Sequence, residues 1–160
     1  MEKNSHSEDF ELFKVIKVEV LTATPDIPIS EDEESRGYFP EIPLLNFELE
    51  NGENFLMTNI PVSIAIEIAR KINAVEGADS RLTIAELIPE ICVIDRIIID
   101  SVIPYSNAYQ ATVEIRLEGF SEIQRFQVIP SHATLLALIA GTDIFVSSSI
   151  IKSPENKRNA

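Results

Sequence analysis

Chemically reactive side chains are few in this sequence, and their types argue against several kinds of site. The chain has two histidines, His6 and His132, and one cysteine, Cys92. A zinc site usually takes several histidine and cysteine ligands, so we do not expect one here. The few glycines form no loop that could surround a phosphate, and no Gly-x-Ser-x-Gly elbow presents a nucleophile. Carboxylates could still bind Mg²⁺ or Mn²⁺, although no spacing marks such a site.

The polar residues that remain stand where helices are expected to begin. Thr83 and Glu86 have the spacing of a capping box, in which each side chain accepts a hydrogen bond from the other residue's backbone N–H. We expect Ser131 to be the N-cap of a later helix, with His132 in its first turn. Arg81 is expected to pair with a nearby carboxylate. His132 is open to two interpretations: a hydrogen-bonded, partly buried side chain, or a base or metal ligand.

Hydrophobic periodicity predicts the elements that must hold these residues in place. Alternation of apolar and polar residues is typical of strands with one buried face, and an apolar stripe at helical spacing is typical of amphipathic helices. The expected strands are Phe10–Leu21, Leu44–Glu50, Phe55–Ile60, Val93–Ile103, Tyr109–Glu118, Phe120–Ile129 and Ile144–Ser148. The expected helices are Pro61–Ala74, a short helix after Thr83, and Pro130–Ala140, the last of them closed by Gly141.

The order and character of these elements favour one fold class. Asn51-Gly52 lies between two strands and is a hairpin signal. Val93–Ile103 is strongly apolar and should be an interior strand, and helix Pro130–Ala140 should be buried at the centre. These features predict an α+β fold, a mixed, largely antiparallel sheet packed with about three helices. We place a single domain at 10–151, between disordered tails at 1–9 and 152–160.

Charge and composition narrow the expected partners and location. The net charge is −13 and the basic residues are scattered, so nucleic-acid binding, which relies on a basic surface, is disfavoured. The acidic run at 31–34 is expected to be a solvated loop, with a metal-binding loop as the alternative. The sequence shows no membrane span and no secretory signal, and we expect Cys92 to be a reduced, buried thiol. These features together predict a cytoplasmic protein.

The segment from Ile129 to Val146 resembles the C-terminal signature of a known family. It reads I-P-S-H-A-T-L-L-A-L-I-A-G-T-D-I-F-V. The signature of the bifunctional nuclease family, long catalogued as a domain of unknown function, runs roughly R-P-S-D-A-I-A-L-A-L-R-x-G-x-P-I-F-V. The earlier elements follow in the order that the family shows. The resemblance therefore extends over roughly Phe10–Ile151, nearly the whole domain.

The resemblance implies a mixed-sheet α+β fold, a homodimer, and the cleavage of DNA and RNA that is reported for some members. Hydrolysis of a phosphodiester needs an activated water and positive charge to stabilise the transition state. By this resemblance, Glu86 would be a metal ligand or base, and His132 a base or ligand. Arg81 would clamp the phosphate, Ser131 would contact the substrate, and the metal would be Mg²⁺ or Mn²⁺.

The sequence departs from the family pattern at several polar positions. Where the family has arginine before Pro-Ser and aspartate after it, this chain has Ile129 and His132. The arginine that closes the helix becomes Ile139, and the proline before I-F-V becomes Asp143. The loss of both arginines removes positive charge from the place where a phosphate would bind. Two hypotheses stay open: a metal-assisted nuclease, and a homodimeric binding or regulatory module that keeps the fold without the chemistry.

Overall fold

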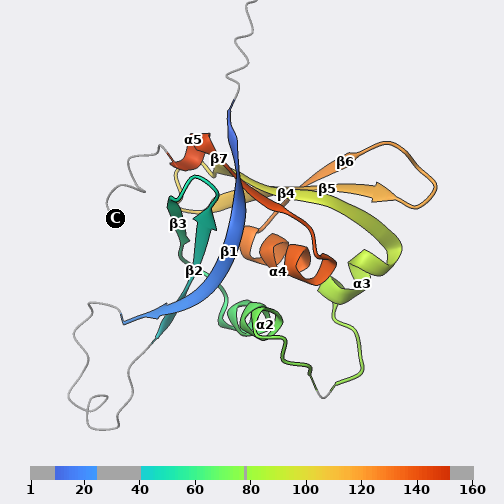
Figure 1. The fold of residues 1–160 in the computed structure, drawn as a ribbon, viewed down its shortest axis with the longest axis horizontal. Coiled ribbons are helices and arrows are strands. Elements are labelled where there is room, and N and C mark those ends of the chain that lie inside the picture. Colours follow the sequence, from blue (N-terminus) through green and yellow to red (C-terminus); the bar gives the residue numbers. More distant parts are fainter. Residues whose placement is uncertain (1–9, 25–40, 78, 152–160) are drawn as a thin grey trace, which may run out of the picture.

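The computed structural model describes residues 10–24, 41–77 and 79–151 and confirms the α+β fold (Figure 1). The strands are β1 (Leu12–Ala23), β2 (Ile42–Leu49), β3 (Asn54–Met57), β4 (Cys92–Val102), β5 (Tyr109–Leu117), β6 (Gln124–Val128) and β7 (Ile144–Ser147). The helices are α2 (Val62–Ile72), α3 (Ile84–Ile91), α4 (Pro130–Ala140) and α5 (Ser148–Ile151). The predicted elements are therefore present, with bounds that differ by a few residues, and the short helix α5 was not predicted.

The described strands form one mixed sheet. Its order is β3-β2-β1-β7-β4-β5-β6, so β3 and β6 lie at its edges. The pairing of β4 with β7 is parallel, and the other neighbours pair antiparallel. The strand β4 lies between β7 and β5, which confirms the prediction of an interior strand. The hairpin of β2 and β3 is also confirmed, and Gly52 in its turn has a positive φ of 84°.

The sheet bends strongly, and β1 carries the bend. The first residues of β1 pair with β7, and the rest of the strand pairs with β2. The register of the second pairing shifts between Val15 and Lys17, an irregularity that bends and twists a strand. The sheet curves back on itself, so that the edge strand β3 comes close to β5. Phe55 of β3 packs edge-on against Tyr109 of β5 with ring centroids 5.1 Å apart, although four strands separate β3 from β5 in the sheet order.

Helix α4 lies inside this curve, and the prediction of a buried central helix is confirmed (Figure 1). Strands β4 and β5 lie beside it, and α2 and α3 pack against it. Apart from His132, its residues are small or apolar, which allows close packing around the helix. Gly141 ends the helix in the left-handed conformation, where glycine carries no steric cost.

One prediction about a single residue is wrong, and the error has a physical cause. Ser131 is not the N-cap of α4: the N-cap is Ile129, because Pro130 occupies the first helical position, for which its fixed φ is suited. Glu114 lies on the polar face of β5, as its alternation indicates, but only 4% of it is exposed. Arg96 and Arg125 from the neighbouring strands cover its carboxylate.

Some expectations fall on residues outside the described ranges. These are the two predicted tails at 1–9 and 152–160 and the acidic run at 31–34. Cys92 is buried as expected, and this burial raises the pKa of its thiol. None of the helices within the described ranges combines the length and the apolar character that crossing a bilayer requires.

Candidate functional site: an apolar pocket beside His132

The candidate site lies where α2, α3 and α4 meet. A capping box fixes the beginning of α3. The hydroxyl oxygen of Thr83 accepts a hydrogen bond from the Glu86 N–H at 3.3 Å. The Glu86 carboxylate accepts one from the Thr83 N–H at 2.8 Å, so the predicted capping box is confirmed. Lys71 of α2 pairs with the same carboxylate at 3.5 Å and ties α2 to α3. The start of α3 is thus fixed against α2.

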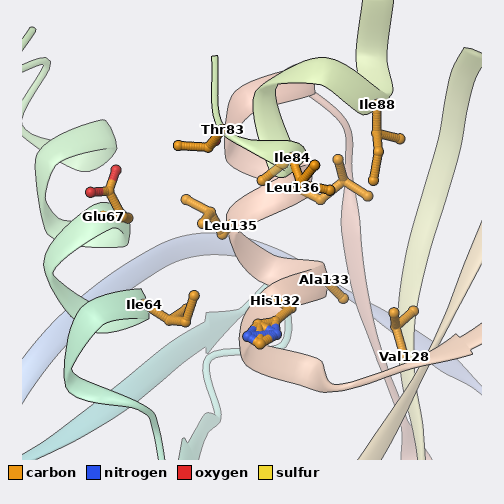
Figure 2. A pocket seen from close by; sticks show the side chains of 11 residues that line it. Ile64, Glu67, Thr83, Ile84, Ile88, Val128, His132, Ala133, Leu135 and Leu136 are labelled. Carbon is orange, nitrogen blue, oxygen red and sulfur yellow. The ribbon is translucent and has the colours of Figure 1, made fainter. Parts of the chain in front are cut away.

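These helices enclose a pocket of about 430 Å³. Most of its lining is apolar and comes from α2, α3, the end of β6 and α4; the largest of these side chains are Ile64, Ile84, Ile88, Val128, Leu135 and Leu136. Figure 2 shows His132 beside Ala133 in the first turn of α4, with Ile64 of α2 facing it. The polar side chains in the lining belong to Glu67, Thr83 and His132.

The polar side chains of the pocket differ in how their hydrogen bonds are satisfied. Glu67 accepts a hydrogen bond from Arg70 at 3.2 Å, one turn further along α2. Thr83 is engaged in the capping box. No hydrogen bond joins the imidazole of His132 to any part of the chain that the structure describes. The half-buried imidazole is therefore the polar group of the pocket that a bound molecule could satisfy.

Glu86 and Arg81, the other residues named from the sequence, have local partners. The hydrogen bond from the Thr83 backbone is the main cause that lowers the pKa of Glu86, with a smaller effect from Lys71. Arg81 donates to both carboxylate oxygens of Asp79, at 3.0 and 2.7 Å, which confirms the expected pairing. Its side chain is 87% exposed. Arg81 is thus a surface residue with a carboxylate already bound to it.

The structure brings His132 and Thr83 to one pocket, and it places the Glu86 and Arg81 side chains outside the lining. Nowhere in the described ranges do three or more His, Cys, Asp or Glu side chains converge in a way that could hold a metal ion. The described residues around Glu86 therefore do not fit a site for Mg²⁺ or Mn²⁺. Ser131 faces a different cavity, on another side of the first turn of α4.

The pocket itself was not anticipated from the sequence, although one signal of it is visible there. The short helix α3 and its flanks carry more apolar side chains than one buried stripe requires, and Leu82, Ile84, Leu87 and Ile91 stay exposed. Such an excess of exposed apolar side chains on a short helix indicates a surface that binds a ligand or a partner. Which part of that surface is concave depends on how α2 and α4 approach it, and no local pattern encodes this.

Comparisons with known proteins identify no relative: no protein-family model matches the chain, and no curated protein matches it significantly. The resemblance to bifunctional nucleases accordingly stays a prediction. The same holds for the homodimer and for the nucleic-acid partner that the resemblance implies.

Proposed function

We propose that this protein is a binding module, and that its ligand is a small, mainly apolar molecule with one hydrogen-bonding group. The observation that carries this proposal is the apolar lining of the pocket between α2, α3 and α4. Pockets that enclose small molecules have volumes of roughly 300–1,000 Å³ and mainly apolar walls with a few polar groups. A volume of about 430 Å³ lies within this range.

The chemistry of the walls defines the class of ligand. Apolar surface transferred from water to such walls contributes about 25 cal/mol per Å², so a compact apolar body gains most of its affinity there. The imidazole of His132 offers both a donor and an acceptor when it is neutral, which suits a hydroxyl group on the ligand. A hydroxylated aromatic or alicyclic molecule meets both requirements.

The charges around the pocket disfavour a phosphodiester in it. The lining contains the carboxylate of Glu67 and contains neither lysine nor arginine. A net charge of −13 adds long-range repulsion against nucleic acid. The pocket therefore supports a neutral ligand better than a polyanion.

A direct test uses 1-naphthol and naphthalene as probes, because the chain has no tryptophan and naphthalene fluorescence can be followed without that background. We expect 1-naphthol to bind more tightly than naphthalene by about two- to tenfold, the value of one neutral hydrogen bond. Ala85→Phe places a large side chain in the pocket and should weaken both probes by about tenfold or more. His132→Leu should remove the preference for 1-naphthol.

The matched control is Ala69→Phe. Ala69 is also a half-buried helical alanine, but it lies on α2 outside the pocket lining, and both affinities should stay within about twofold of the wild type. Circular dichroism would confirm that each variant is folded. Equal binding by the wild type and Ala85→Phe would mean that the probes bind elsewhere, and the proposal would fail.

Hydrolysis of phosphodiesters, which the family resemblance implies, is the second candidate function. The observation in its favour is that His132 is half-buried at a concave site and has a free imidazole among the described residues. Single- and double-stranded DNA and RNA would be incubated with Mg²⁺ or Mn²⁺ and with the wild type, His132→Ala or Glu86→Gln. We expect the same background rate in all three, because the pocket brings neither a clamp nor a carboxylate cluster to His132. Cleavage by the wild type that both substitutions reduce would establish the nuclease and overturn the binding module.

A further inference from the structure

A second, smaller cavity lies at the beginning of α4, where the two ends of the bent sheet meet. Its volume is about 80 Å³, more than twice the ~30 Å³ that one water occupies in the liquid. The end of β3 and the residues after it, the start of β5, and the first turn of α4 line it. None of the lining residues is acidic or basic. This cavity shares no lining residue with the apolar pocket that carries the proposed function.

Ser131 lies in the wall of this cavity, and its hydroxyl group has no partner within the described part of the chain. Only 2% of the residue is exposed. Yet its side chain makes no hydrogen bond to any residue in the described ranges, in contrast to Thr134, whose hydroxyl donates to the Pro130 carbonyl at 2.8 Å. The Ser131 hydroxyl is not among the fully enclosed polar atoms without a partner, of which the described residues contain only Asn46 Oδ1, so it borders the open space of the cavity. A hydroxyl in such a position can donate a hydrogen bond to a molecule that enters the cavity.

The backbone around Ser131 adds further donors. The N-cap residue Ile129 has no side chain that could accept a hydrogen bond, and the first acceptor along the helix, the Ile129 carbonyl, is used by the Ala133 N–H at 3.0 Å. The N–H groups of Ser131 and His132 bond to no described residue. Unpaired N–H groups at the start of a helix, together with the helix dipole, favour negative charge.

We propose that this cavity binds an anionic oxygen group, a carboxylate or a phosphate, through the Ser131 hydroxyl and the backbone N–H groups that begin α4. Asn59 and Asn107 are also lining residues of the cavity, and a carboxamide side chain carries an N–H₂ donor. Without a lysine or arginine in the wall, affinity comes from directed hydrogen bonds, which select a compact group that fits about 80 Å³.

The start of α2 provides an internal control with nearly the same local sequence pattern. Its N-cap is Pro61, again without a side-chain cap, and the Ala65 N–H bonds to the Pro61 carbonyl at 3.0 Å. Ser63 occupies the second helical position in α2, as Ser131 does in α4. Ser63, however, is exposed, whereas Ser131 is enclosed. An effect of the helix end alone would act on both serines equally.

The test is an amide NMR titration of the full chain with inorganic phosphate and, separately, with acetate, at an ionic strength kept constant with sodium chloride. We expect the Ser131 and His132 amide signals to shift and saturate with at least one of the two anions. The Ser63 and Ile64 signals should follow only the small linear drift of the other exposed amides. Saturation with one anion and not the other would identify the group as phosphate or as carboxylate.

Two variants then test the hydroxyl. Ser131→Ala should weaken the saturating anion by about tenfold, the value of one hydrogen bond to a charged group, and Ser63→Ala should leave its affinity unchanged. The wild-type titration decides the matter by itself if Ser131→Ala does not fold. Shifts that never saturate, shifts of equal size at Ser63 and Ser131, or an unchanged affinity in a folded Ser131→Ala would each overturn the proposal.

Discussion

Replacing Phe55 with alanine is expected to lower the free energy of unfolding by about 3–5 kcal/mol. The ring of Phe55 is completely buried, and it contacts Tyr109 at 5.1 Å and Phe47 at 6.1 Å between ring centroids. Its removal takes away the buried apolar surface and leaves a cavity at the point where β3 meets β5. Equilibrium unfolding in urea, followed by circular dichroism, would measure the change.

Phe126→Ala is the matched control for this substitution. Phe126 lies on the edge strand β6 and is 51% exposed, so we expect a loss below about 1 kcal/mol. The two variants remove the same group, and only burial distinguishes them. If both lost the same free energy, the contact between the two ends of the sheet would not be a main source of stability.

Glu114→Gln is expected to destabilise the fold by about 2 kcal/mol at pH 7. The Glu114 carboxylate accepts hydrogen bonds from Arg96 at 2.8 and 3.2 Å and from Arg125 at 3.2 Å. We place the loss below the 3–5 kcal/mol typical of a fully buried pair, because both arginines keep part of their side chains in water and can be rehydrated. Glu118→Gln, at an exposed position without an ion pair among the described residues, should change stability by less than about 0.5 kcal/mol.

The contribution of Glu114 should also depend on pH. Its hydrogen bond from Arg96 is the largest cause that lowers the pKa of Glu114 below its ordinary value of 4.5, and burial opposes this effect only in part. Because the pKa is lower in the folded state, the stabilisation is complete above the unfolded value and is lost as the pH falls through the folded value. The difference in stability between wild type and Glu114→Gln should therefore be constant from neutral pH down to about 5.5 and should shrink below about 4.5. A difference that grew toward low pH would contradict this assignment.

Much of the fold could be predicted because its signals are local. The alternation in Tyr109–Leu117 places one set of side chains on the helical side of β5, whatever the rest of the chain does. The capping box of Thr83 and Glu86 closes within four consecutive residues, so its spacing alone predicts it. The αL residue Gly141 and the turn at Gly52 are further cases in which one residue type determines a local conformation.

The sites could be predicted only in part, because they depend on contacts between distant segments. His132 was singled out from its position in a helix, and the structure places it at a pocket. Neighbours such as Ile64 and Val128 are separated from His132 in sequence and reach the pocket only through the packing of α2 and β6 around α4. Ser131 was predicted to be a helix cap; its hydroxyl instead has no partner among the described residues, because the helix starts at Pro130 and its N-cap is Ile129, two residues before Ser131.

The amino-acid sequence by itself determined the secondary structure, the fold class and the buried character of α4, since each follows from periodicity, turn residues and the apolar surface of one segment. The tertiary structure decided what borders the first turn of α4. It placed an apolar pocket beside His132 and a small cavity with several polar residues beside Ser131, and it buried Glu114 beneath two arginines. Each of these environments is formed by segments that lie apart in the sequence and meet only when the core packs. The pocket forms where α2 and β6 pack around α4, the cavity where the end of β3 meets the start of β5, and the Glu114 site where β4 and β6 flank β5.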